Sequence, residues 1–320
     1  MPKPISSLLT LSPTIRNYVW GGQSLLSLVG PNAAWDGKPI SEVWSLYERN
    51  PVTNAEFTGR TLAEIVTEYP NEILGELTVS KGNKRFPLLI KLLDCASWLS
   101  LQVHPNNEQA LQLEGLNFIG KTEAWHILNA EPDSHLIAGI KAGTSIETLH
   151  AAIGNETILD LVEYHKVQND DTIFVPAGTI HALGPGLLIY EVQQTSDITY
   201  RIFDWNRPQN NGRTLHIEKS TAVTDPLSQG KIFHHQKTGG PVTSLVKCPY
   251  FHLEKLSGTQ ERDTKGLSFH ALTVTDGEAR VSSLGSDVVL RKFDSVLVPA
   301  VSGKYRLDGV FQILCSSVSE

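Results

Sequence analysis

Strand-length segments separated by turns dominate the second half of this chain of 320 residues. From Thr172 almost to the end, short apolar runs alternate with turn-forming residues at short intervals. Helical spacing is confined to short stretches, chiefly residues 61–77, 107–113 and 144–163. Strands outnumber helices and do not alternate regularly with them, which disfavours a doubly wound parallel sheet. The pattern predicts a mainly β fold, an antiparallel sandwich or barrel with a few short helices.

A repeated pattern indicates two β domains. Residues 171–177 (DTIFVPA) and 294–300 (DSVLVPA) each contain an acidic turn, a four-residue strand and Pro-Ala. The first copy continues through a glycine to His181, whereas the second continues without a histidine. We therefore expect the C-terminal domain to repeat the fold of the first domain and to lack its site.

The boundaries of these domains follow from composition. Residues 224–241 are rich in Pro, Gly, Ser and His instead of alternating apolar residues, so we expect the linker there. The predicted domains are residues 1–235, which carry the site and short helical insertions, and residues 236–320. Within the first, residues 124–140 are predicted to form a strand pair with its turn at residues 131–134.

Composition excludes several classes of protein. The chain is 40% hydrophobic and 19% charged, as in an ordinary globular protein, and its net charge of −7 argues against nucleic acid as a partner. The most apolar region, residues 86–103, is interrupted by Lys91 and Asp94, which argues against a membrane span. The three cysteines are widely scattered, which favours a reducing compartment. The N-terminal segment contains no long apolar core, so we expect no signal peptide. We therefore expect a cytoplasmic protein with neither a nucleic-acid nor a membrane partner.

Polar side chains that share one strand face suggest a metal site. In a strand over residues 99–104, Ser100, Gln102 and His104 lie on one face, opposite the apolar residues. The following Pro-Asn-Asn ends the strand and starts a helix with an asparagine cap. The imidazoles of His104 and His181, the carboxylate of Glu123 and the amide oxygen of Gln102 form a donor set that suits zinc, although iron(II) or manganese would also fit. The predicted ligands are Gln102, His104, Glu123 and His181.

For several charged residues near these ligands, the sequence allows two interpretations. Glu191 interrupts an apolar strand, so it either pairs with a cation such as Arg201 or acts as an acid/base group with a raised pKa. Arg201 forms a structural salt bridge with Asp197 or Asp204, or it is a fixed cation that stabilises an oxyanion or binds phosphate. Lys121 shares a strand face with Glu123, and it either forms a local ion pair with that residue or has a functional role at the predicted metal site.

Lys91 interrupts the apolar strand over residues 86–93. Its spacing favours a side chain that snorkels at the strand end over a cation aimed at an anionic substrate.

Three segments together resemble one enzyme family. They are FPLLIKLLDCASWLSLQVHPN, GKTEAWHIL and PAGTIHALGPGLLIYEVQQTSDITYRIFDW, within residues 40–205. In order and residue type they are similar to the class I, zinc-dependent mannose-6-phosphate isomerases in their short bacterial form. The resemblance implies two cupin β-barrels of jelly-roll type, with one zinc ion in the first. By position it implies zinc ligands at Gln102, His104, Glu123 and His181, and a catalytic arginine at Arg201. It also implies that Ser100 and Lys121 line the substrate pocket, with Lys91 and Glu191 near it.

The implied reaction interconverts an aldose and a ketose phosphate through a cis-enediol(ate), so the expected partner is a small sugar phosphate. Zinc would act as Lewis acid, Arg201 would stabilise the enediolate, and Ser100 with a lysine would hold the phosphate. Glu191 is our hypothesis for the group that moves the carbon-bound proton. We expect a monomer or weak dimer. Two alternatives remain at this point: an iron-dependent cupin dioxygenase, and a cupin that binds sugar phosphates without turnover.

Overall fold

The computed structural model describes residues 8–28, 37–208, 213–235, 240–283 and 285–319. The chain forms two compact units, each built from separate stretches of sequence. We call residues 16–42 and 93–234 the first unit, and residues 1–15, 43–92 and 235–320 the second unit. Residues 236–239 of the predicted linker lie outside the described residues.

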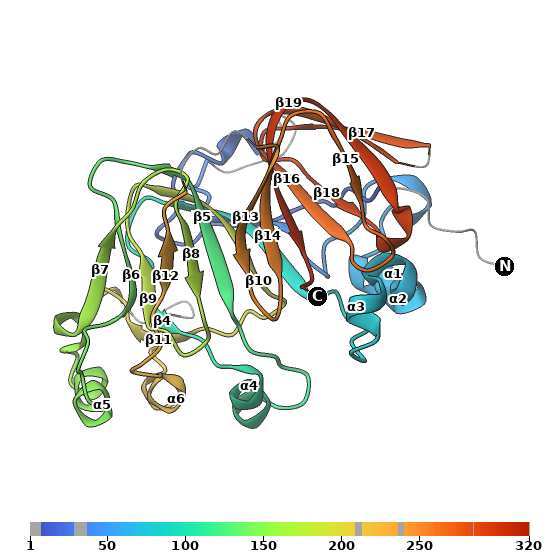
Figure 1. Ribbon diagram of the computed structural model, residues 1–320. Coiled ribbons are helices and arrows are strands. Elements are labelled where there is room, and N and C mark those ends of the chain that lie inside the picture. Colours follow the sequence, from blue (N-terminus) through green and yellow to red (C-terminus); the bar gives the residue numbers. More distant parts are fainter. Residues whose placement is uncertain (1–7, 29–36, 209–212, 236–239, 284, 320) are drawn as a thin grey trace. The chain divides into compact units, whose positions relative to one another are not determined.

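The first unit is a sandwich of antiparallel strands (Figure 1). One layer contains the neighbours β10-β5-β8-β12, and the other has the order β11-β4-β9-β6-β7. Trp125 and Ile173 from the first layer pack with Leu136 and Leu183 from the second in one buried core. The strands are β4 (Leu101–Val103), β5 (Glu123–Ala130), β6 (His135–Ile140), β7 (Val162–Lys166), β8 (Thr172–Val175), β9 (His181–Leu183), β10 (Leu187–Gln194), β11 (Tyr200–Phe203) and β12 (Lys231–Phe233).

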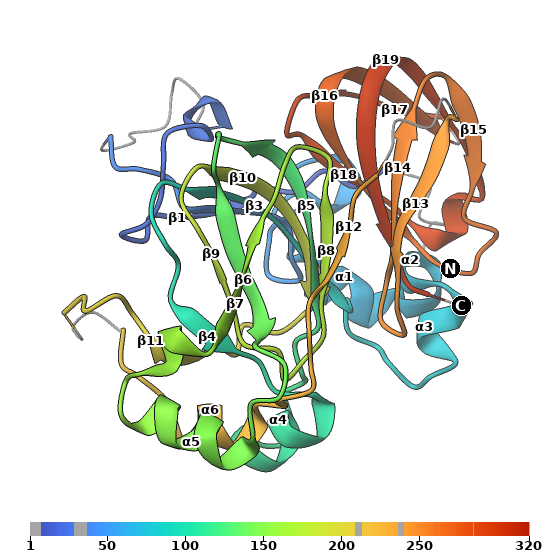
Figure 2. The ribbon, with the colours of Figure 1, turned by 60° about the vertical axis from the view of Figure 1, so that its left-hand side comes forward.

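Three helices lie at one end of this sandwich (Figures 1 and 2). They are α4 (Asn107–Glu114), α5 (Ile146–Gly154) and α6 (Ile217–Val223), with short 3-10 turns η1 (Leu26–Leu28) and η3 (Ile158–Asp160) elsewhere. The predicted asparagine cap of α4 is confirmed. The Asn106 side chain accepts a hydrogen bond from the Gln109 backbone N–H, and the Gln109 side chain accepts one from the Asn106 N–H.

The second unit contains the C-terminal sheet, with strand order β13-β14-β19-β16-β17. Strand β15 pairs with β19, and β18 pairs with β16. A core that includes Leu272, Val296 and Ile313 holds the sheet together. The strands are β13 (Val242–Lys247), β14 (His252–Ser257), β15 (Gln260–Asp263), β16 (His270–Ser283), β17 (Ser286–Arg291), β18 (Ser295–Val298) and β19 (Lys304–Ser317), with the turn η4 (Ala300–Ser302).

The segment before β4 supplies the remaining elements. Strands β1 (Thr14–Arg16), β2 (Glu42–Leu46) and β3 (Leu88–Cys95) are neighbours in that order, and every residue of β2 and β3 is buried. Between them lie η2 (Ala55–Phe57) and the helices α1 (Leu62–Glu68), α2 (Pro70–Leu74) and α3 (Glu76–Val79). No helix in the described part of the chain has the length and apolar character needed to cross a membrane.

The mainly β, antiparallel architecture with short helices is confirmed, but some details of the prediction are wrong. Strands β5 and β6 exist with a turn between them, yet they do not pair, because the turn carries the chain from one layer to the other. The helix predicted over residues 144–163 ends at Gly154, and strand β7 begins at Val162. Helix α6 was not predicted, since seven residues are too few for a clear helical period.

Candidate metal centre

A row of paired residues across the second layer places three of the predicted site residues on one face. Arg201 on β11 lies opposite Gln102 on β4, and Gln102 lies opposite His181 on β9. Directly opposed residues of an antiparallel pair project to the same side of the sheet. His104, two residues after Gln102, continues this face. The prediction that Gln102 and His104 share a face is confirmed, because both side chains lie beside His181.

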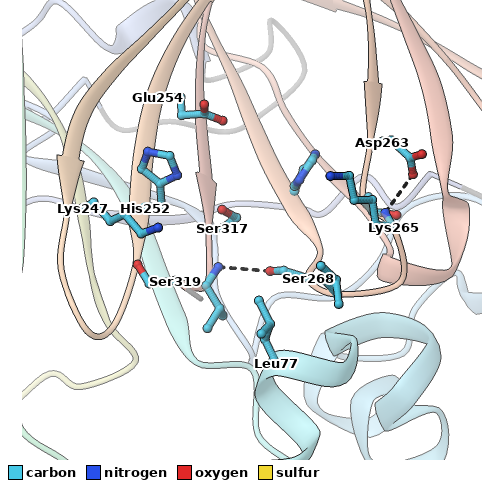
Figure 3. Close-up of a pocket in the computed structure, with 13 residues that line it drawn as sticks. Leu77, Lys247, His252, Glu254, Asp263, Lys265, Ser268, Ser317 and Ser319 are labelled. Carbon is cyan, nitrogen blue, oxygen red and sulfur yellow. Dashed lines mark hydrogen bonds between the residues drawn. The ribbon is translucent and has the colours of Figure 1, made fainter.

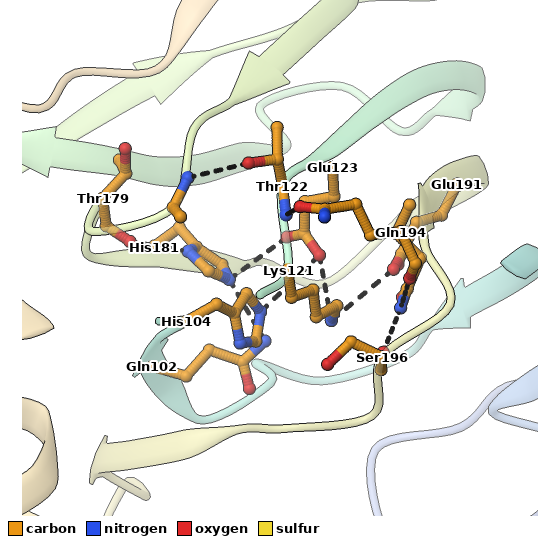
Figure 4. Close-up of polar contacts among 12 residues, drawn as sticks. Gln102, His104, Lys121, Thr122, Glu123, Thr179, His181, Glu191, Gln194 and Ser196 are labelled. Atoms are coloured by element: carbon orange, nitrogen blue, oxygen red, sulfur yellow. Dashed lines mark hydrogen bonds and ion pairs between the residues drawn. The ribbon is translucent and has the colours of Figure 1, made fainter. Parts of the chain in front are cut away.

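The other layer supplies a carboxylate to the same interior (Figure 4). Glu123 Oε1 lies 3.2 Å from His181 Nε2, and Glu123 Oε2 lies 3.5 Å from His104 Nε2. One candidate ligand atom from each of these three residues lies within 4.8 Å of the other two. All three side chains are at most 2% exposed. Two imidazoles and a carboxylate converge on one point, which is a donor set suited to a divalent cation.

The imidazole of His181 is held in the form that a metal needs. Its Nδ1 lies 2.9 Å from the carbonyl oxygen of Thr179 and donates to it, so Nε2 faces the interior with a lone pair. Burial lowers the pKa of His181 to about 4, and the ring is therefore neutral at neutral pH. Thr179 was missed as a positioning residue, because a contact made by its carbonyl oxygen leaves no mark in the sequence.

Gln102 completes the predicted set. Its Nε2 lies 3.2 Å from His181 Nε2, and its Oε1 accepts a hydrogen bond of 3.3 Å from Ser100 Oγ. A half-turn of the amide would exchange the two atoms and direct Oε1 to the interior, where it could act as a further metal ligand. The residues present thus fit a site for a divalent cation with nitrogen and oxygen ligands.

Lys121 lies between two carboxylates in the same buried region. Its Nζ is 2.9 Å from Glu123 Oε2 and 3.7 Å from Glu191 Oε1. The sequence did not decide which cation pairs with Glu191. In the structure Lys121 forms this ion pair. Glu123, Glu191 and Lys121 together carry an excess of negative charge, in a region that is nearly closed to water. A divalent cation would reverse that sign and favour an anionic ligand.

Hydrogen bonds from Gln194 hold the segment that carries Lys121. The Gln194 Oε1 accepts a hydrogen bond of 2.9 Å from the Thr122 backbone N–H, and its Nε2 donates one of 3.0 Å to Asn107 Oδ1. Thr122 Oγ1 in turn accepts a hydrogen bond of 3.3 Å from the Ala177 N–H. Gln194 and Thr122 were not identified from the sequence. The only signal was a glutamine pair at the end of an apolar strand.

Arg201 has a different set of contacts. Its Nη1 donates a hydrogen bond of 2.9 Å to the Thr214 carbonyl oxygen, and its backbone N–H lies 3.2 Å from His216 Nδ1. Burial, followed by the neighbouring Arg213, lowers the pKa of Arg201. Asp204, one of the two acids considered as its salt-bridge partner, forms a buried ion pair with Arg213, and Arg213 Nε lies 2.6 Å from Asp204 Oδ2.

Lys91 lies in the second unit, on β3, with its Nζ 5.2 Å from the centroid of the Trp44 ring. Its side chain is buried against this ring, a cation–π contact. The substrate-binding role implied for Lys91 stays a prediction.

Comparison with known proteins identifies the family. A model of the type I phosphomannose isomerase catalytic domain matches residues 8–131, and a model of the mannose-6-phosphate isomerase cupin domain matches residues 241–318. The chain is 33% identical to the mannose-6-phosphate isomerase of Streptococcus mutans over 98% of both chains. It is also 33% identical to the mannose-6-phosphate isomerase ManA of Bacillus subtilis, over 96% of this chain and 98% of that protein.

A solved structure gives the same result. The crystal structure of the mannose 6-phosphate isomerase from Bacillus subtilis superposes with a TM-score of 0.85, at 29% identity, over 97% of this chain and 99% of that one. The family models, the sequence relatives and the structural superposition agree. The chain belongs to the type I phosphomannose isomerase family.

Proposed function

We propose that this protein interconverts D-mannose 6-phosphate and D-fructose 6-phosphate through a cis-enediol(ate). The near-full-length similarity to mannose-6-phosphate isomerases supports this reaction over a cupin dioxygenase or a silent sugar-phosphate binder. The observation that carries the proposal for the site is the cluster of His104, Glu123 and His181 with Lys121 and Glu191 beside it, all buried in the first unit.

We infer that the metal is zinc, held by Gln102, His104, Glu123 and His181, one ion per chain. When bound, the ion supplies a Lewis acid for the carbonyl and hydroxyl oxygens of the sugar. Thr179 keeps the His181 ring in the tautomer that this role requires.

The chain's own residues transfer the proton, stabilise the charge of the intermediate and bind the substrate. Glu191 moves the proton between C2 and C1, since it is a buried carboxylate beside the ammonium of Lys121. Lys121 offsets the charge of both carboxylates and donates to an oxygen of the substrate. Arg201, held by the Thr214 carbonyl, stabilises the negative charge of the enediolate. Ser100 contacts the phosphate of the substrate. A role for Lys91 in substrate binding rests on the family resemblance alone.

The test is a coupled assay for fructose 6-phosphate formation from mannose 6-phosphate. We expect the purified enzyme to lose activity with a chelator and to recover it with Zn²⁺, while Fe²⁺ or Mn²⁺ restores less. Absence of turnover in a zinc-loaded sample would overturn the reaction. Full recovery with Fe²⁺ or Mn²⁺ and none with Zn²⁺ would overturn the metal assignment but not the reaction.

Three further properties are proposals of the same kind. We propose that the enzyme acts in the cytoplasm, and that it is a monomer or weak dimer, which sedimentation velocity would test. The division into residues 1–235 and 236–320 also stays a proposal. Limited proteolysis within residues 224–241 would support that boundary.

A further inference from the structure

A cavity lies in the second unit, beside the C-terminal sheet (Figure 3). Its volume is about 290 Å³, close to the lower end of the range of about 300–1,000 Å³ for small-molecule sites. Every candidate residue of the metal centre discussed above, apart from Lys91, belongs to the first unit, so this cavity is a separate feature. Lysine, histidine and serine side chains supply most of its polar groups, and Leu77 from α3 forms part of its wall.

Hydrogen-bond donors surround this cavity. Lys247 and His252 lie on one side, and Lys265 lies on the opposite side (Figure 3). Ser319 is only 2% exposed, yet its Oγ has no hydrogen-bond partner among the described residues. This oxygen has almost no surface open to the cavity, so the lysine and histidine side chains are the donors that can reach a ligand.

A buried chain of hydrogen bonds fixes His270 as a further donor. The guanidinium of Arg262 has no acceptor, so in its hydrogen bond with Tyr305 it donates to the phenol oxygen. Burial raises the pKa of Tyr305 well above its ordinary value, so the phenol keeps its proton. The Tyr305 hydroxyl lies 2.7 Å from His270 Nδ1 and donates to it. The ring proton of a neutral His270 must then lie on Nε2, on a residue that lines the cavity.

The two acids that line the cavity are already engaged. Glu254 Oε2 lies 2.5 Å from Arg262 Nη2 in an ion pair, and Asp263 Oδ1 accepts a hydrogen bond of 2.8 Å from the Lys265 backbone N–H. Arg262 offsets the charge of Glu254, and the ammonium groups of Lys247 and Lys265 are exposed to solvent, so these three cations outnumber the two acids. The cavity as a whole favours an anion.

We propose that this cavity in the second unit is a binding site for a small phosphomonoester of the size of a sugar phosphate. Donors on opposite sides suit a tetrahedral phosphate, which accepts hydrogen bonds from several directions, better than a planar carboxylate. The volume exceeds what a bare phosphate ion needs, and Ser317 on the cavity wall can bond a hydroxyl of a sugar. The site is distinct from the metal centre and does not depend on the proposed reaction.

Calorimetric titration of the zinc-loaded, full-length protein with mannose 6-phosphate tests this proposal. The key variant is Lys247→Met/Lys265→Met, and the matched control is Lys141→Met/Lys231→Met, which removes two exposed lysines of the first unit. We expect the key variant to bind one equivalent fewer than the control and to keep its isomerase activity. Equal stoichiometry in the two variants would overturn the proposal, whether or not the isomerase reaction itself is found.

Three further titrations refine the test. Tyr305→Phe keeps the ring but removes the donor to His270, so we expect about a tenfold weaker binding at the second site, the loss of one hydrogen bond. Inorganic phosphate should bind to the wild type but not to the Lys247→Met/Lys265→Met variant at this site. Unphosphorylated mannose that binds there as well as mannose 6-phosphate would show that phosphate is not what the site recognises.

Discussion

Replacement of Lys121 by methionine should strongly destabilise the metal-free protein. The Lys121 side chain is 5% exposed and lies 2.9 Å from Glu123 and 3.7 Å from Glu191. At an effective dielectric constant of about 20, these distances correspond to gross attractions of about 6 and about 4 kcal/mol. Desolvation of the ammonium offsets much of this. Removal of one partner from a buried ion pair typically costs about 3–5 kcal/mol, because the remaining charge is left buried.

The assay is urea denaturation in the presence of a chelator. We expect Lys121→Met to lower the free energy of unfolding by about 3–5 kcal/mol. The exposed Lys231→Met should change it by less than about 0.5 kcal/mol. Bound zinc should reduce the cost of Lys121→Met, since the cation takes over part of the charge compensation.

A double-mutant cycle isolates the contact between Lys121 and Glu191. Adding Glu191→Gln to Lys121→Met removes one of the two carboxylates that the first change leaves uncompensated. The double variant should therefore be more stable than the sum of the single effects by about 1–3 kcal/mol. A loss below about 1 kcal/mol for Lys121→Met, or additivity within about 0.5 kcal/mol, would refute this account of the site.

Three other outcomes follow from contacts described above. Glu191→Gln should lower kcat by about 10²–10⁴-fold with a small change in KM, measured at zinc saturation; normal turnover would exclude Glu191 as the proton carrier. Gln194→Leu leaves the Thr122 backbone N–H without its acceptor, so it should lower the free energy of unfolding by about 1–3 kcal/mol and weaken catalysis through Lys121. If neither the free energy of unfolding nor the catalytic activity changes, Gln194 does not hold this segment. Asn106→Ala removes the cap of α4 and should cost about 1 kcal/mol in urea denaturation, whereas Asn106→Asp should restore most of it.

Local rules determined a large part of this protein before any long-range contact was known. The two-residue period of a strand put Gln102 and His104 on one face, and the capping preference of asparagine marked the start of α4. The length and spacing of the β segments gave the fold class. These features depend on residues within a few positions of one another, and short-range sterics and hydrogen bonding decide them.

Tertiary structure alone decided which distant groups meet. Lys121 and Glu191 are far apart in the chain, and their contact exists because β5 and β10 pair in the register that sets Glu123 opposite Gln193. The same choice of strand partners separated β5 from β6, although the turn between them resembles that of a hairpin. Pairing between strands depends on how the apolar faces of the whole sheet are buried, and no local pattern encodes that. The chain from Arg262 through Tyr305 to His270 likewise required the folded C-terminal sheet, which brings three separate strands into contact.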